Sequence, residues 1–324
     1  MRLAVAQKLD DKMVSLIQNK LGNLCEIDFI HKADDSIRKE SLVKADIVMA
    51  MNIKRDLKEE EFELIKNAKL IQITLAGADI IPFEKLSPHT VVCSNGGAYS
   101  DPIAEHAMGM MLSLARNFLP LHRSLSNGIF DQWTKHKLLK GSTLGIIGFG
   151  GIGKRTAELA RGFGMKIFAI NKTGKSDIHT DFIGTIDDLD YLLKNSDFIL
   201  LSIALNKHTK KIIGKRELEL MKPDAVLINV ARGDLVDEGA LYNHLKANPQ
   251  FKAGIEAWWI EPFNYPKFEI HYPFFELDNF LGSPHNSYLV DGIMMKALDA
   301  AVDNILAYIE QRPLKNIQNR EDYI

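Results

Sequence analysis

A glycine-rich turn between an apolar run and a helical stretch constrains the fold of this chain most. The apolar residues 144–147 lead directly into Gly148, Gly150 and Gly153 in the pattern G-x-G-x-x-G, and helix-forming residues 154–160 follow. In this context the first glycine permits a tight turn, the second lets the backbone approach a pyrophosphate, and the third lets the helix pack on the strand. The N–H groups at the start of the helix attract the same anion. The turn predicts a dinucleotide-binding unit, with contacts from Gly148, Gly150, Gly151, Ile152 and Gly153.

The end of the next apolar run indicates which dinucleotide is preferred. That run covers residues 166–170 and leads into Asn171, Lys172 and Thr173, where an NAD-binding protein usually carries an acidic residue for the ribose hydroxyls. A carboxylate would repel a 2′-phosphate, whereas a lysine and two hydrogen-bonding side chains can hold one. We therefore expect NADP as the preferred cofactor. The alternative is that Lys172 is a solvated turn residue and that NAD is bound.

Short apolar runs alternate with amphipathic stretches over nearly all 324 residues. This alternation is typical of parallel strands joined by crossover helices, so the predicted fold class is α/β. The candidate strands fall into two groups, and the amphipathic stretch after His285 could return to the first group. We expect two Rossmann-like domains, the larger one inserted within a smaller, flavodoxin-like one. The predicted ranges are 1–98 with 289–324 for the substrate domain and 99–288 for the dinucleotide-binding domain.

Three segments with charged residues follow the glycine-rich turn, each after a predicted strand. They contain Arg232, Glu261 and His285. Ligands of an open α/β sheet bind at the carboxyl ends of its strands, so these side chains could converge on one crevice. Arginine can hold a carboxylate and polarise a carbonyl, and a histidine oriented by a carboxylate can exchange a proton near neutral pH. Each residue alone has an ordinary explanation as a capping or solvated side chain, but together they predict reduction of a 2-keto acid.

The order of these motifs resembles that of the D-isomer-specific 2-hydroxyacid dehydrogenases. The matching segments are Asn229-Val230-Ala231-Arg232-Gly233-Asp234-Leu235-Val236-Asp237-Glu238, Glu261-Pro262, Pro284-His285 and Leu75-Ala76-Gly77-Ala78-Asp79. The resemblance covers almost the entire chain. It implies an intertwined two-domain enzyme, usually a homodimer, that acts on a small 2-keto or 2-hydroxy acid such as glyoxylate or hydroxypyruvate. It also implies that Arg232, Glu261 and His285 are catalytic.

The same resemblance implies further contacts. Ala76 and Gly77 would bind the substrate carboxylate through their N–H groups, together with Arg232 and His285. The residues implied to contact the cofactor after the glycine-rich turn are Val230, Ala231, Arg232, Glu256 and His285. Glu256 departs from the family pattern, because aspartate usually stands near the nicotinamide amide and glutamate is one methylene longer. No metal site is expected.

Two other functions use a similar fold. A dinucleotide-sensing scaffold, resembling the C-terminal binding proteins, would use the closed dimer to recruit partners, although this chain lacks long disordered extensions. A formate or phosphite dehydrogenase would use no keto acid. Formate dehydrogenases commonly place glutamine before the catalytic histidine, whereas this chain has Ser283-Pro284-His285.

Composition limits the partners and the location of the protein. The formal net charge is −2 with basic and acidic residues interspersed, so we expect no nucleic-acid partner. No apolar run is long enough for a membrane span. Cys25 and Cys93 stand in apolar surroundings, and this use of cysteine favours a reducing cytoplasm.

The apolar helix expected over residues 103–119 is too hydrophobic to cover one core face, so we expect it to pack between the subunits of a homodimer. The aromatic segment 262–275 is expected to be a packed loop or a subunit contact, and the alternative is a pocket for an aromatic substrate.

Overall fold

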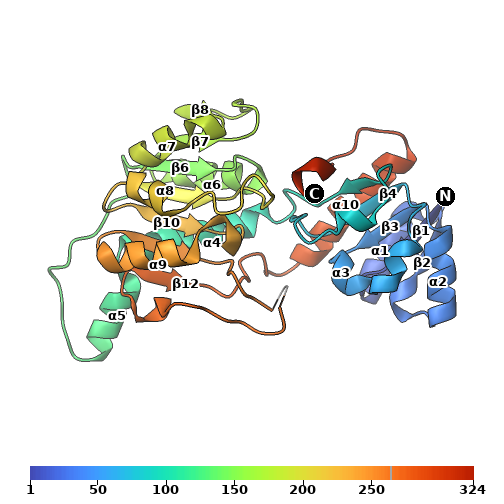
Figure 1. The fold of residues 1–324 in the computed structure, drawn as a ribbon, viewed down its shortest axis with the longest axis horizontal. Coiled ribbons are helices and arrows are strands. Elements are labelled where there is room, and N and C mark those ends of the chain that lie inside the picture. The colour runs from blue at the N-terminus through green and yellow to red at the C-terminus, as the bar shows by residue number, and fades with distance from the viewer. Residues whose placement is uncertain (263–264) are drawn as a thin grey trace. The chain divides into compact units, whose positions relative to one another are not determined.

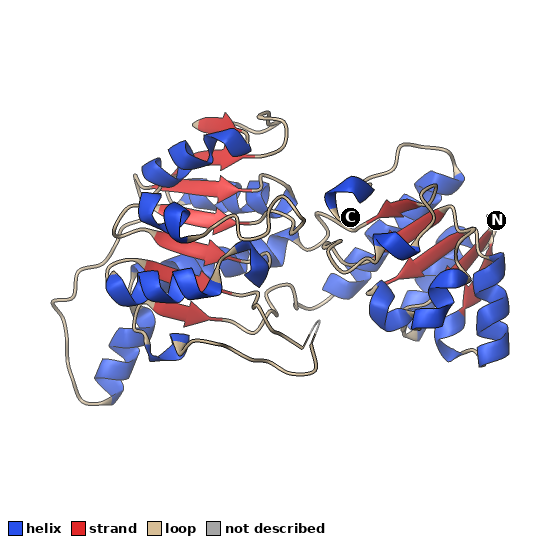
Figure 2. Cartoon of the chain, in the orientation of Figure 1, coloured by secondary structure: helices blue, strands red, loops and turns tan. Residues whose placement is uncertain are grey.

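Two parallel sheets organise the chain, as the alternating sequence pattern predicts. The computed structural model describes residues 1–262 and 265–324. The chain divides into unit 1, Met1–Tyr99 with Asp291–Ile324, and unit 2, Ser100–Val290. In each unit the strands run parallel and helices pack on the sheet (Figure 1, Figure 2). The predicted α/β class is confirmed.

Unit 1 contains a five-stranded sheet in the order β2-β1-β3-β4-β5 within the described residues. Its main elements are β1 (Arg2–Val5), α1 (Asp11–Leu21), β2 (Glu26–Phe29), α2 (Asp35–Lys44), β3 (Ile47–Ala50), α3 (Ile53–Asp56), β4 (Leu70–Ile73), β5 (Val91–Cys93) and α10 (Ile293–Ile309). Helices α1 and α10 contact each other (Figure 1). Leu298, Ala301 and Ile305 of α10 join the core formed by Leu3 and Val5 of β1. The helix near the end of the chain thus completes the core of the first sheet.

Unit 2 contains a seven-stranded sheet in the order β12-β11-β10-β9-β6-β7-β8, counted over the described residues. Its main elements are α4 (Ser100–Ala115), α5 (Phe118–Ser126), β6 (Thr143–Ile147), α6 (Gly151–Gly162), β7 (Lys166–Ile170), β8 (Phe182–Gly184), α7 (Leu189–Asn195), β9 (Phe198–Leu201), α8 (Lys215–Leu220), β10 (Val226–Asn229), α9 (Glu238–Ala247), β11 (Lys252–Ile255) and β12 (Phe280–Gly282). Helices α4 and α6 pack together, and α8 packs between α7 and α9 (Figure 1). Strand β6 lies between β7 and β9, so the strand order reverses beside the glycine-rich turn.

Helix α4, which the sequence predicts to pack between subunits, needs no second subunit to bury its apolar side chains. It ends at Ala115, and its apolar side chains, including Met108, Met111 and Leu114, are already buried within the single chain. They pack on α6 and on strands β10 to β12. Its exposed positions form one narrow stripe that contains Asp101, Glu105 and Gly109. The hydrophobicity of α4 is therefore explained by its own unit, since the helix is covered both by a neighbouring helix and by the sheet.

Several exposed apolar side chains lie close together in the arm, which we define as residues 117–138. Figure 1 shows α5 and the loop after it extending away from the sheet of unit 2. Large apolar side chains are more than half exposed at Phe118, Leu125, Ile129, Phe130, Trp133 and Leu138. The tip is ordered by Asp131, whose Oδ1 accepts the N–H groups of Trp133 at 2.8 Å and Thr134 at 3.1 Å. Trp133, at 83% exposure, therefore stands on a turn whose backbone is held by Asp131.

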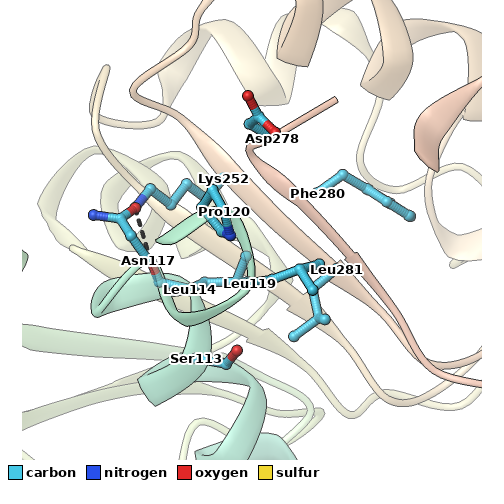
Figure 3. A pocket seen from close by; sticks show the side chains of 9 residues that line it. All are labelled: Ser113, Leu114, Asn117, Leu119, Pro120, Lys252, Asp278, Phe280 and Leu281. Atoms are coloured by element: carbon cyan, nitrogen blue, oxygen red, sulfur yellow. Dashed lines mark hydrogen bonds between the residues drawn. The ribbon is translucent and has the colours of Figure 1, made fainter. Parts of the chain in front are cut away.

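The base of the arm is anchored to the amino end of β11. Lys252 donates from Nζ to the carbonyl oxygen of Leu114 at 2.7 Å and to Oδ1 of Asn117 (Figure 3). Asn117 in turn donates from Nδ2 to the carbonyl oxygen of Lys135 at 3.2 Å. Burial lowers the pKa of the Lys252 ammonium, and nearby Lys137 lowers it further. The small pocket of Figure 3 thus surrounds a structural anchor.

None of the helices in residues 1–262 and 265–324 combines the length and the apolar character that crossing a membrane requires.

Candidate active site

The residues that the sequence nominates in unit 2 follow parallel strands, so their loops leave the sheet at the same edge. Neighbouring strands end in register, for example Ile147 opposite both Ile170 and Leu201. The loops after β6, β7, β10, β11 and β12 carry, in that order, Gly148, Asn171, Arg232, Glu256 and His285. The pocket of Figure 3 includes the first residue of β11 and therefore lies at the other end of that strand.

The three glycines of the turn lack side chains for different reasons. Gly148 has a φ of +99°, and a Cβ there would lie 2.5 Å from the backbone N and Cα of Ile203. A Cβ on Gly153 would lie 2.6 Å from the carbonyl oxygen of Gly148. A Cβ on Gly150 would meet no described atom within 4 Å. The fold itself therefore requires Gly148 and Gly153, whereas Gly150 keeps space open before α6.

The start of α6 fits an anionic group. Gly151 and Ile152 are its first two residues, and N–H groups in the first turn of a helix have no partner within the helix. The first turn contains no acidic residue that would repel an anion. The helix dipole and the open space over Gly150 suit the approach of a dinucleotide pyrophosphate.

Asn171 shapes the loop after β7. Its Oδ1 accepts the N–H groups of Thr173 at 3.0 Å and Gly174 at 2.8 Å, and its Nδ2 donates to the carbonyl oxygen of Lys175 at 2.8 Å. These contacts form a local turn of the kind that asparagine favours. Of the three residues predicted to hold a 2′-phosphate, Asn171 therefore has its amide engaged within the loop. It fixes the backbone that carries Lys172 and Thr173, both of which are exposed.

The loop of Arg232 is fixed at two points. Asn229 accepts the N–H of Ala231 with Oδ1 at 3.0 Å, and it donates from Nδ2 to the carbonyl oxygen of Arg232 at 2.7 Å. A Cβ on Gly233 would lie 2.4 Å from the carbonyl carbon of Trp258, so the loop packs directly on the turn after β11. This places the loop of Arg232 beside the turn that leads to the candidate acid–base pair.

Glu261 and His285 form that pair. His285 Nδ1 lies 2.7 Å from Oε1 and 2.8 Å from Oε2 of Glu261. The side chains are 7% and 20% exposed for Glu261 and His285, so water competes little for the contact. The backbone N–H of Trp258 donates to Oε2 of Glu261 at 3.1 Å. A carboxylate accepts hydrogen bonds, so Nδ1 carries its hydrogen toward Glu261, and Nε2 is the ring nitrogen suited to proton exchange with a substrate.

Glu256 provides a buried carboxylate at the same edge. The residue is 0% exposed, and its Oε1 accepts the N–H of Ser287 at 2.9 Å. Its Oε2 is buried and has no hydrogen-bond partner among the described residues. A buried carboxylate oxygen without a donor is unfavourable, so this atom suits a donor from a ligand. The primary amide of a nicotinamide ring is such a donor, and the residues present therefore fit a nicotinamide dinucleotide.

Ala76 and Gly77 follow β4 in unit 1, whereas the other candidate residues belong to unit 2. Asn95 holds their loop by donating its N–H to the carbonyl oxygen of Leu75 at 2.8 Å and its Nδ2 to that of Thr74 at 3.1 Å. Within the described ranges, no backbone carbonyl accepts the N–H of Ala76 or Gly77. These two groups are therefore available to an anionic ligand.

In the aromatic segment 262–275 most described residues are exposed and Phe274 is buried; residues 263–264 lie outside the described residues. Phe274 is fully buried and stacks on Trp259, with ring centroids 5.6 Å apart. The loop supports the turn of Trp258, which donates its N–H to the carboxylate of the acid–base pair. Sequence reasoning missed Trp258 and Gly233, although both stand beside motifs that it identified. In the described part of the chain, no cluster of three or more His, Cys, Asp or Glu side chains could hold a metal ion.

The chain is similar to known proteins in sequence and in fold. Residues 108–287 match the sequence model of the D-isomer specific 2-hydroxyacid dehydrogenase NAD binding domain. The chain is 33% identical to a hydroxypyruvate reductase of Thermotoga maritima over 88% of this chain and 90% of that one. It is 32% identical to a glyoxylate reductase of Thermococcus litoralis, over 80% of each chain. A solved acyclic imino acid reductase in complex with NADPH and D-Arg has a TM-score of 0.77 and 26% identity, covering 98% of this chain and 100% of that one.

The different surroundings of Gly148 and Gly150 give a paired prediction. Gly148→Ala forces a left-handed alanine against the backbone of Ile203, so we expect it to destabilise the cofactor-free protein by about 1–3 kcal/mol. Gly150→Ala meets open space, so its thermal unfolding should match that of the unsubstituted protein. Its affinity for NADPH should nevertheless fall about tenfold or more, since about 1.4 kcal/mol of lost contact suffices. Calorimetry and a fluorescence titration measure both quantities; unchanged NADPH affinity of Gly150→Ala would contradict this assignment.

Proposed function

The chain belongs to the D-isomer specific 2-hydroxyacid dehydrogenases, and we propose that it transfers hydride between NADP(H) and a small 2-keto or 2-hydroxy acid such as glyoxylate or hydroxypyruvate. The observation that carries this proposal is the buried Glu261–His285 pair, which lies at the same sheet edge as the glycine-rich turn and the Arg232 loop. The names of the relatives in Thermotoga and Thermococcus support the choice of substrates.

Different residues of the site bind the substrate, polarise its carbonyl group and transfer the proton. Arg232 binds the substrate carboxylate and the adjacent carbonyl oxygen, which orients and polarises the ketone. The N–H groups of Ala76 and Gly77 bind the carboxylate as well. His285 donates a proton from Nε2 to the carbonyl oxygen during reduction and accepts it during oxidation, while Glu261 orients the ring and stabilises the imidazolium. A bound nicotinamide supplies or accepts the hydride.

The proposed preference for NADP rests on the loop after β7. Its sequence has Asn171 where an acidic residue would bind the ribose of NAD, and the next residue is Lys172. The hydrogen bonds of Asn171 hold that loop in one conformation, so Lys172 and Thr173 are presented to a 2′-phosphate by an ordered backbone. The remaining cofactor contacts are assigned to Gly148, Gly150, Gly151, Ile152, Gly153, Val230, Ala231, Arg232, Glu256 and His285.

We also propose a homodimer, with the arm as its contact surface. The exposed apolar side chains of the arm exceed what a monomeric surface usually gathers in one segment. An arm that extends away from its own unit cannot bury these groups there, whereas a two-fold axis can pair it with a second copy. Trp133, which is 83% exposed on the turn held by Asp131, is the type of residue that dominates interfaces. The two free cysteines are consistent with a cytoplasmic location, which we include in the proposal.

His285→Ala and Arg232→Ala test the chemical roles. Both proteins should fold and bind NADPH, while kcat/KM for glyoxylate and hydroxypyruvate falls by about 10²- to 10⁴-fold, the usual effect of losing acid–base catalysis. Arg232→Lys should be similarly poor, because a point charge replaces a planar fork. NADPH oxidation with a panel of 2-keto acids provides the measurement.

The matched control for these variants is His271→Ala. His271 also pairs with a carboxylate, at 2.6 Å from Glu238, but its side chain is 58% exposed and we expect normal activity from this variant. If His285→Ala keeps near-normal turnover, His285 has no part in the mechanism. If the unsubstituted protein binds NADPH yet reduces no 2-keto acid, the dinucleotide-sensing scaffold becomes the better explanation.

Asn171→Asp tests the cofactor preference with a side chain of the same size, which loses only the donor to the Lys175 carbonyl oxygen. Aspartate keeps the acceptor for the N–H groups of Thr173 and Gly174, but its charge would repel a 2′-phosphate. We expect the ratio of NADPH to NADH specificity constants to fall on the order of 10- to 100-fold, and Lys172→Ala to lower it on the order of tenfold. Lys175→Ala removes an equal charge from the same loop and is the control. Equal specificity constants for the two cofactors in the unsubstituted enzyme would refute the preference.

A Phe130→Ala, Trp133→Ala double variant tests the arm. These side chains are 78% and 83% exposed, so their removal leaves the fold of the single chain intact but deletes the proposed anchors. Sedimentation equilibrium should show a dimer for the unsubstituted protein and a dissociation constant at least about tenfold higher for the variant. Phe163→Ala, which removes an exposed aromatic ring outside the arm, should remain dimeric. A monomer at micromolar concentration in the unsubstituted protein would rule out this surface.

A further inference from the structure

The catalytic candidate His285 has an unusual backbone conformation. Its φ is +50°, in the left-handed region that residues other than glycine rarely occupy. A residue persists in that region only when its surroundings hold it there. The interactions that hold this turn therefore decide where the imidazole lies.

Glu256 supplies two such interactions. Its carbonyl oxygen accepts the N–H of His285 at 3.0 Å, and its carboxylate Oε1 accepts the N–H of Ser287 at 2.9 Å. Glu256 is 0% exposed, and its own N–H donates to the carbonyl oxygen of Asn229 at 3.0 Å, which fixes it to β10. A single buried residue thus holds the turn on both sides of the left-handed position.

We propose that Glu256 is a positioning residue for His285, in addition to its proposed contact with the cofactor. Its Oε1 fixes the left-handed turn, and this turn brings Nδ1 of His285 to within 2.8 Å of both carboxylate oxygens of Glu261. The ring of His285 is then held by the Glu261 carboxylate, and its backbone N–H is held by the Glu256 carbonyl oxygen. The Glu256 carboxylate holds the same turn two residues further on, through the N–H of Ser287. This inference rests on the proposed catalytic role of His285.

The length of the Glu256 side chain is the decisive property. Aspartate would withdraw the carboxylate by one carbon–carbon bond, about 1.5 Å, which takes Oε1 out of hydrogen-bonding range of the Ser287 N–H. Glutamine keeps both the length and an acceptor oxygen for that N–H. It replaces the other oxygen, the one without a partner among residues 1–262 and 265–324, with an amide nitrogen. Aspartate thus loses both the turn contact and the cofactor contact, whereas glutamine loses only the cofactor contact, so the difference between the two variants isolates the turn contact.

The contact with the turn is tested in the cofactor-free protein. The Nδ1–H proton of His285 should give a slowly exchanging nuclear magnetic resonance signal, because it is bonded to the buried Glu261. Glu256→Asp should abolish this signal or broaden it into several conformers, whereas Glu256→Gln should retain it. Ser287→Ala keeps the backbone N–H and should also retain it. If Glu256→Asp keeps the signal unchanged, the inference is overturned.

Kinetics provide the second readout. Glu256→Asp should lower kcat on the order of 10- to 100-fold, and Glu256→Gln should raise the dissociation constant of NADPH and lower kcat less than the Asp variant does. Equal kcat values for the Asp and Gln variants would contradict a role that depends on side-chain length. Thermal unfolding shows whether each variant is folded. If Glu256→Asp is not folded, the nuclear magnetic resonance signal of His285 is compared between Glu256→Gln and Ser287→Ala, and its loss in Glu256→Gln would overturn the inference. An inactive His285→Ala with an unaffected Glu256→Asp would reject this inference alone, whereas an active His285→Ala would reject the proposed function.

Discussion

The parallel direction of the strands in unit 2 is the constraint on which the candidate active site depends. Because neighbouring strands end in register, the loops after them leave at one edge and bring together residues that are far apart in sequence. The strand order reverses between β6 and β9, and there the two loops meet without side chains between them: a Cβ on Gly148 would lie 2.5 Å from the backbone of Ile203. In the glycine-rich turn, Gly148 therefore allows close packing against the loop after β9, and Gly150 leaves space for a ligand at the start of α6.

Close backbone packing also stabilises the buried carboxylates of Glu256 and Glu261, because it brings backbone N–H donors to them. Removing a carboxylate from water is unfavourable unless hydrogen bonds replace those of the solvent. Glu261 obtains a donor from the N–H of Trp258, and Glu256 obtains one from the N–H of Ser287. The turn of Trp258 is itself positioned by Gly233, whose missing side chain allows the Arg232 loop to touch it. The charges that give the site its chemistry are thus stabilised by the same turns that place them.

Sequence reasoning located the buried strands better than the exposed ones. The apolar runs at 144–147 and 166–170 correspond to β6 and β7, because strands covered on both faces are continuously hydrophobic. The edge strands β2 and β8 were missed, since each is short, and in β2 the side chains of Glu26-Ile27-Asp28-Phe29 are exposed or half-buried. Periodicity also could not tell which surface covers α4, because a helix buried by its own unit and one buried by a partner have the same composition.

Sequence reasoning also differs in how well it finds two kinds of group in the site: the side chains that carry the chemistry and the groups that position them. Arg232, Glu261 and His285 could be nominated from sequence because their side chains do chemistry that few residue types can do. The groups that hold them are largely main-chain N–H groups, which almost every residue carries, so no residue type marks their position. Glu256 belongs to both kinds, because its side-chain Oε1 accepts a hydrogen bond from the N–H of Ser287, 31 residues further along the chain. In the sequence, the extra methylene of Glu256 is only a departure from the family pattern. The structure explains it, because the longer side chain reaches the N–H of Ser287.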